Sequence, residues 1–163
     1  IAEKEAEVAR RFAPLRERLR GRRVLLYTGG HKSWALVATL KDMGMEVIGT
    51  SVRKATDQDE QRAQALLGDG GQVFGAIPQT EMYRMLAEDE ADILLSGGRT
   101  QFVALKARKP WLDTNQERHH AYAGYEGFLN LATQIDRALH APVWSQLNRP
   151  APWETTRGTG GAA

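Results

Sequence analysis

The 163-residue chain contains no cysteine. It therefore has no disulfide framework, no thiol nucleophile and no thiolate ligands for zinc or an iron–sulfur cluster. No run approaches the roughly 18 consecutive apolar residues of a membrane-spanning helix, and no basic segment leads into an apolar one as in a secretory signal. We expect no membrane association and a cytoplasmic location. Because the first residue is Ile1 rather than Met, we also expect further residues upstream.

Neither sign of charge dominates the chain, since 22 Lys and Arg residues oppose 20 Asp and Glu residues. Charged residues make up 26% of the chain and hydrophobic residues 42%, which is typical of a folded globular domain. Eight basic and four acidic residues fall within positions 1–23. Such a run is compatible with nucleic-acid binding, but it is more typical of a solvated helix face or of a face packed on another subunit. No nucleic-acid partner is expected.

Hydrophobic patterning predicts strands that alternate with helices. Strands are expected at residues 23–27, 45–50, 72–74, 91–95 and 111–113. Helices are expected at residues 3–20, 34–43, 57–67, 78–88 and 100–107, and over a long segment that ends at Leu139. This alternation predicts an α/β fold, a Rossmann-like doubly wound parallel sheet of four to five strands flanked by helices. The commonest strand orders place the first strand beside the fourth or an equivalent neighbour, although the order cannot be derived from one sequence.

The same pattern divides the chain into three parts. Residues 1–22 are expected to form an N-terminal linking helix, with Pro14 as a point where it can kink. Residues 23–147 form the Rossmann-like domain, and residues 148–163, rich in Pro, Gly and Thr, form an extended tail. Ser33 is expected to cap the helix after the first strand.

Two glycine loops follow the first and fourth strands, and both contain a glycine pair, a basic residue and hydroxyl residues. Paired glycines allow tight turns with exposed N–H groups, and the helix start behind each loop attracts anions. Gly-Gly alone is also an ordinary turn between a strand and a helix, but its repetition at one sheet edge favours a site for a polyanion. The candidate residues in these loops are Gly29, Gly30, His31, Lys32, Ser33, Gly97, Gly98 and Arg99.

Other chemistries lack their motifs. The spacing of a phosphate-binding G-x-x-x-x-G-K-[ST] loop is absent, as is the dinucleotide fingerprint G-x-G-x-x-G. No Ser-His-Asp order, retaining carboxylate pair or H-E-x-x-H motif is present, so no self-contained catalyst is indicated. Trp34 and Phe102, at the starts of the helices behind the glycine loops, are expected to pack in the core.

A third polar loop follows the fifth strand and should open at the same sheet edge. Its candidate binding residues are Asn115, Glu117, His119 and His120. The adjacent histidines could ligate a metal, but adjacent side chains often diverge, and no cysteine or carboxylate cluster completes a ligand set. We therefore assign no metal ligand.

The sequence around these three loops resembles the nitrogenase component 1 superfamily. The resemblance includes the first strand and its loop (24–34), the second strand (40–50) and the fourth strand and its loop (92–99). The segment 112–127 and the ending at 142–153 are more specific, and they resemble the E-type subunits of the scaffold on which the iron–molybdenum cofactor is built. The resemblance covers residues 3–154, nearly the whole chain.

This resemblance implies the C-terminal Rossmann-like domain of a larger scaffold subunit. In the family, E-type and N-type subunits form an α2β2 heterotetramer that receives an iron–sulfur precursor from a cluster donor protein. Molybdenum and homocitrate are added there with help from the nitrogenase iron protein. The family's cluster-ligating cysteines would then lie upstream of Ile1.

The resemblance also assigns roles to single positions. In catalytic α subunits a histidine in the loop after the last strand ligates molybdenum, and the matching loop here offers Asn115 near that position. This suits a scaffold that must release its cluster, although His119 and His120 keep a ligand role open. Lys32 lies near the position of a family arginine beside the cofactor, and Arg99 near that of a lysine beside homocitrate.

Two alternatives remain open from the sequence. One is a catalytic nitrogenase α-type subunit or a related dark-operative reductase subunit, which would make the whole protein an oxidoreductase. The other is a plain binding module for a phosphate ligand.

Overall fold

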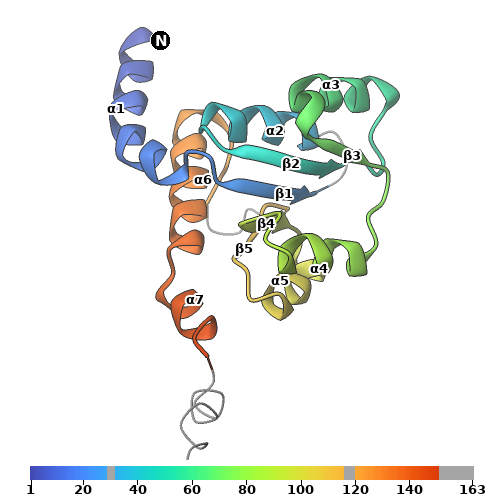
Figure 1. Ribbon diagram of the computed structural model, residues 1–163. Helices are drawn as coiled ribbons and strands as arrows, with labels where there is room; N and C mark the ends of the chain where they lie inside the picture. The colour runs from blue at the N-terminus through green and yellow to red at the C-terminus, as the bar shows by residue number, and fades with distance from the viewer. Residues whose placement is uncertain (29–31, 116–119, 151–163) are drawn as a thin grey trace, which may run out of the picture.

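The computed structural model describes residues 1–28, 32–115 and 120–150. Its centre is a five-stranded parallel sheet with the order β3-β2-β1-β4-β5 (Figure 1). The predicted α/β fold is confirmed, and the first strand does lie beside the fourth. The strands are β1 (Arg23–Tyr27), β2 (Glu46–Ser51), β3 (Gln72–Phe74), β4 (Ile93–Ser96) and β5 (Trp111–Asp113).

Helices cover both faces of the sheet. Their bounds are α1 Ala2–Leu19, α2 Lys32–Asp42, α3 Asp57–Leu67, α4 Gln79–Ala87, α5 Gln101–Lys106, α6 Gly124–Leu139 and α7 Pro142–Leu147. Short 3-10 turns, η1 (Gly68–Gly70) and η2 (Gly98–Thr100), precede β3 and α5. Helices α1, α2, α3 and α6 contribute to one hydrophobic core, and α4 and α5 to the other (Figure 1). Among the described residues, no helix combines the length and the hydropathy to cross a bilayer.

The central strands are buried on both faces, as their continuous apolar runs predict. Val24 and Leu26 of β1 face the core under α1, α2 and α6, whereas Leu25 faces the core under α4 and α5. Leu95 and Leu94 of β4 divide in the same way. Successive side chains of a strand point to opposite faces, so these two central strands join the two cores into one domain.

Helix α1 packs along α6. The rings of Phe12 and Phe128 meet edge to face with centroids 4.9 Å apart. Glu126 accepts hydrogen bonds from Arg11 (2.8 Å) and Lys4 (3.1 Å), and these bonds lower the pKa of its carboxyl group. Helix α1 therefore packs against α6, one of the helices that cover the sheet. Its role as a link to another domain stays a prediction.

Three local expectations were wrong or incomplete. Ser33 lies inside the first turn of α2 rather than before it, and its hydroxyl donates to the carbonyl oxygen of Ser51 instead of capping the helix. Phe102 is 53% exposed, because the short helix α5 turns Val103 and Ala104 to the core and Phe102 outward. Helix α7, which begins with a proline, was not predicted. The tail beyond Pro150 lies outside the described residues.

An ion pair at the amino-terminal edge of the sheet joins β1 to the residue before β4. Asp92 accepts hydrogen bonds from the Arg23 backbone N–H (2.8 Å) and from Nη2 of its guanidinium (2.9 Å). Burial alone would raise the pKa of Asp92, but these hydrogen bonds and the positive charge of Arg23 bring it below its ordinary value.

Asp92→Asn is expected to lower the free energy of unfolding by about 1–2 kcal/mol at pH 7, because the charge-assisted bonds are lost. A lowered pKa in the folded state stabilises the fold above the unfolded pKa of about 4, and this contribution disappears as the pH falls through the folded value. Denaturant titrations between pH 7 and pH 2 should therefore converge for the two proteins at the acid end. A constant difference at every pH would contradict this assignment.

Candidate functional site

The three loops singled out in the sequence start next to one another. Tyr27, the last residue of β1, is in register with Ser96, the last residue of β4, and Ser96 is in register with Asp113, the last residue of β5. The loops after these strands therefore leave the same edge of the sheet. The chain order reverses between β1 and β4, and doubly wound sheets form a ligand-binding crevice at such a point.

Buried hydroxyl groups concentrate at this edge. Among the described residues, every buried polar or charged residue except Asp136 is a Ser or Thr, and each lies near the carboxyl end of a strand or at the start of the following helix: Ser33, Thr50, Ser51, Ser96, Thr100 and Thr114. The hydroxyls of Thr50 and Thr114 are buried and have no hydrogen-bond partner within the described part of the chain. The edge is thus lined by neutral donors and acceptors.

The start of α2 is fixed to the end of β2. Ser33 Oγ donates to the carbonyl oxygen of Ser51 at 2.8 Å, and it lies 3.4 Å from Thr28 Oγ1. The guanidinium of Arg62 lies over the Trp34 ring at 5.3 Å. These contacts position the exposed residue Lys32 at the rim of the edge. Its predicted companions Gly29, Gly30 and His31 lie outside the described residues.

A hydroxyl network holds the loop after β4. Ser96 Oγ accepts a hydrogen bond from Trp111 Nε1 at 2.8 Å and lies 2.7 Å from Thr100 Oγ1. Thr100 Oγ1 also lies 3.2 Å from the Gly97 carbonyl oxygen. The network positions η2, which carries the exposed Arg99. No motif in the sequence marks Trp111 for this role, because the role depends on the pairing of β4 with β5.

Two predicted site residues from different loops are brought into contact. A Cβ atom on Gly97 would lie 2.6 Å from Asn115 Nδ2, so the asparagine amide group lies directly against the glycine. The Asn115 backbone N–H donates to Asp113 Oδ1 at 2.8 Å, which fixes the start of the third loop. Of the other residues predicted in this loop, His120 is exposed, and Glu117 and His119 lie outside the described residues.

The two predicted cationic residues, Lys32 and Arg99, precede or begin helices that cover opposite faces of the sheet. Lys32 begins α2, which covers one face, whereas Arg99 precedes α5, which covers the other. Both follow the adjacent strands β1 and β4 at one edge, and both are exposed. In the described ranges, no group of three or more His, Asp or Glu side chains is arranged to hold a metal ion. The edge offers positive charge and hydroxyl groups, which suit an anionic ligand.

Sequence reasoning missed Arg53 and Lys54, which follow β2 at this same edge. The available signal was a pair of basic residues one position after a strand, but no glycine pair accompanied them.

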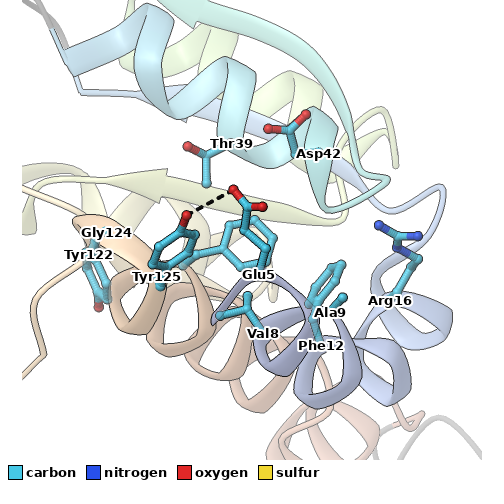
Figure 2. A pocket seen from close by; sticks show the side chains of 11 residues that line it. Glu5, Val8, Ala9, Phe12, Arg16, Thr39, Asp42, Tyr122, Gly124 and Tyr125 are labelled. Atoms are coloured by element: carbon cyan, nitrogen blue, oxygen red, sulfur yellow. Dashed lines mark hydrogen bonds between the residues drawn. The ribbon is translucent and has the colours of Figure 1, made fainter. Parts of the chain in front are cut away.

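Sequence reasoning also missed a hollow between α1, α2 and α6, of about 440 Å³ (Figure 2). Phe12 and Phe128 line it, and Tyr125 donates a hydrogen bond to Glu5 there at 3.1 Å. This bond raises the pKa of Tyr125. None of the predicted site residues that the structure describes lines this hollow.

Comparison with known proteins agrees with this architecture. The family model described as "Nitrogenase component 1 type Oxidoreductase" matches residues 1–140. A protein of Sinorhizobium fredii (strain NBRC 101917 / NGR234) named "Nitrogenase iron-molybdenum cofactor biosynthesis protein NifE" is 54% identical over 159 residues, which cover 98% of this chain and 32% of the relative. A protein of the same name from Klebsiella pneumoniae is 42% identical over 153 residues, covering 94% and 34%.

The structural comparison supports the same fold. The structure titled "Nitrogenase Cp1 at pH 5" superposes with a TM-score of 0.73 at 20% identity, over 93% of this chain and 37% of that chain. At this identity the likeness concerns the fold alone. The chain spans about a third of the length of the curated relatives it matches.

Proposed function

Because the chain belongs to the nitrogenase component 1 type oxidoreductase family, we propose that it is a domain of a scaffold subunit in iron–molybdenum cofactor biosynthesis. The scaffold holds an iron–sulfur precursor as its cargo while molybdenum and homocitrate are added. The observation that carries the proposal is that three loops start at the neighbouring ends of β1, β4 and β5, at the point where the strand order reverses and doubly wound sheets form a ligand-binding crevice. Such a crevice suits a ligand that is bound and then released.

The charge and polarity of the edge support an anionic cargo. Lys32 and Arg99 supply full positive charges, and Asn115 supplies an amide in contact with Gly97. Cluster sulfides and the carboxylates of homocitrate are negatively charged, so these groups attract them without a covalent bond. The chain has no cysteine. We expect its share of the binding to be electrostatic and hydrogen-bonded, and the thiolate ligands to come from the rest of the protein.

The proposal extends to partners and location. The whole subunit would pair with an N-type subunit in an α2β2 heterotetramer, and the nitrogenase iron protein and a cluster donor protein would act on this assembly in the cytoplasm. Asn115, near the position of the molybdenum-ligating histidine of catalytic subunits, favours a scaffold over a catalytic subunit.

Purified full-length protein with its partner subunit provides the test. With the iron protein present, the complex is expected to reduce acetylene at less than a hundredth of the nitrogenase rate, yet to activate apo-nitrogenase after incubation with molybdate and homocitrate. Both readouts come from one acetylene-reduction assay, with and without apo-nitrogenase. Acetylene reduction by the complex alone at nitrogenase-like rates would instead identify a catalytic subunit. Tight nucleotide binding without cluster transfer would identify a phosphate-binding module.

A further inference from the structure

A strained turn follows β2. The Ala55 N–H donates to the Val52 carbonyl oxygen at 2.8 Å, which closes a four-residue turn with Arg53 and Lys54 at its centre. The φ angle of Lys54 is 67°, in the left-handed region. A positive φ at the third position is the signature of a type II turn, where glycine is the usual residue. A lysine backbone is strained in this conformation.

The two other non-glycine residues with positive φ in the described ranges have local explanations. Asp89 follows α4 and Arg108 follows α5, and left-handed residues are common just after a helix. Asp89 pairs with Lys109, and Arg108 donates to the Leu147 carbonyl oxygen at 3.1 Å. Lys54 does not follow a helix, and its side chain makes no hydrogen bond or ion pair with the described residues. The strained backbone at Lys54 is not offset by a contact of its side chain with the described residues, which indicates a functional role for the side chain.

The turn is attached to the start of α2. Ser51 lies at the centre of this attachment: its carbonyl oxygen accepts the 2.8 Å hydrogen bond from Ser33, and its Oγ lies 3.4 Å from the Arg53 N–H. Lys32 directly precedes Ser33. Three exposed cations, Lys32, Arg53 and Lys54, are thereby placed along the carboxyl edge of the adjacent strands β1 and β2.

The acidic residues nearest to Lys54 in the sequence stabilise the start of α3. Asp59 accepts hydrogen bonds from the Thr56 hydroxyl (2.7 Å) and the Thr56 backbone N–H (3.3 Å), which forms the cap of α3. Asp57 and Glu60 lie in the first turn of that helix, where negative charge complements the dipole. Among the described residues, none of these carboxylates forms an ion pair with Lys54. The positive charge of the turn is left for a ligand.

We propose that the Val52–Ala55 turn is an oxyanion subsite, in which Lys54, with Arg53 beside it, binds a multiply charged oxyanion. The inference rests on the proposed function and adds the turn after β2 to the three loops described above. Both a tricarboxylate and molybdate have this chemistry. A lysine ammonium bonded to such a group forms a charge-assisted hydrogen bond, and its loss weakens binding by about tenfold or more.

The test is a titration of the full-length complex with homocitrate and, separately, with molybdate. Lys54→Gln removes the charge and keeps the strain, whereas Lys54→Gly removes both. Both variants are expected to bind one or both ligands about tenfold more weakly, and Lys54→Gly is expected to melt at a higher temperature. Arg10→Gln, a change to an exposed cation on α1, should bind like the unmodified complex. The ligand that is weakened identifies the source of the oxyanion.

Unchanged affinity for both ligands in Lys54→Gln overturns the subsite, even if Lys54→Gly is more stable. The double variant Lys32→Ala, Arg99→Ala separates this failure from that of the proposed function. If the double variant loses binding and the Lys54 variants do not, only the turn subsite is wrong. If the unmodified complex binds neither ligand, both proposals fall.

Discussion

Replacing Lys32 and Arg99 together by alanine is expected to lower the molybdenum and homocitrate content of the full-length complex by about a hundredfold or more, when it is matured with both ligands below the concentrations that half-saturate the unmodified complex. Each residue supplies a full charge at the edge where β1 and β4 end. A charge-assisted hydrogen bond contributes about 1.5–3 kcal/mol, so two such losses amount to about 3–6 kcal/mol of binding free energy. Elemental analysis of molybdenum and mass spectrometry of the released organic acid measure the effect.

A matched control for this variant carries Arg10→Ala and Arg137→Ala. Both arginines are exposed, on α1 and α6, and neither belongs to the three loops, so the pair removes the same net charge from other parts of the surface. Its molybdenum and homocitrate content is expected to equal that of the unmodified complex. Normal incorporation in the Lys32→Ala, Arg99→Ala variant would contradict the electrostatic role of the edge.

Gly127→Ala is expected to lower the free energy of unfolding by about 2–3 kcal/mol, because it overpacks a closed contact. Gly127 is buried in the first turns of α6, and a Cβ there would lie 2.4 Å from the carbonyl carbon of Tyr122. The contacting atom belongs to the backbone of Tyr122, so a change of side-chain rotamer cannot relieve the overlap. Glycine to alanine inside a helix ordinarily stabilises by about 1 kcal/mol, so the expected sign is opposite to helix propensity.

Gly75→Ala is the control for this prediction. A Cβ at Gly75 meets no atom within 4 Å, and the residue does not have a positive φ. Its unfolding free energy should stay within about 0.5 kcal/mol of the unmodified protein. Denaturant titration measures both variants. Equal stability of Gly127→Ala and Gly75→Ala would show that the Tyr122 segment moves freely away from α6.

The sequence carried enough information for the fold because its signals are local. Buried parallel strands read as continuous apolar runs, such as Val24–Tyr27, and helices end at glycines such as Gly44, so elements could be placed within a few residues. The neighbour expected for the first strand came from a general property of doubly wound sheets. Helix α7 was missed because six residues without a buried side chain give no periodic signal.

The parts of the site that contain a glycine pair were predicted from the sequence. The parts that depend on contacts between distant segments were missed. Ser33 is a good capping residue by type, but the nearby Ser51 carbonyl oxygen, on another strand, accepts its hydroxyl instead. The contact of Gly97 with Asn115 depends on the register of β4 and β5. Lys54 reads as an ordinary surface lysine until its backbone conformation is known. These relations join residues 15 or more positions apart or depend on a dihedral angle, so composition and spacing do not contain them.

The most direct measurement is the position of the cargo in crystals of the loaded full-length complex, located by anomalous scattering at the iron and molybdenum edges. The proposal predicts both metals in the crevice outside the carboxyl ends of β1 and β4, within reach of Lys32 and Arg99. Metal density elsewhere, such as in the hollow between α1, α2 and α6, would contradict it.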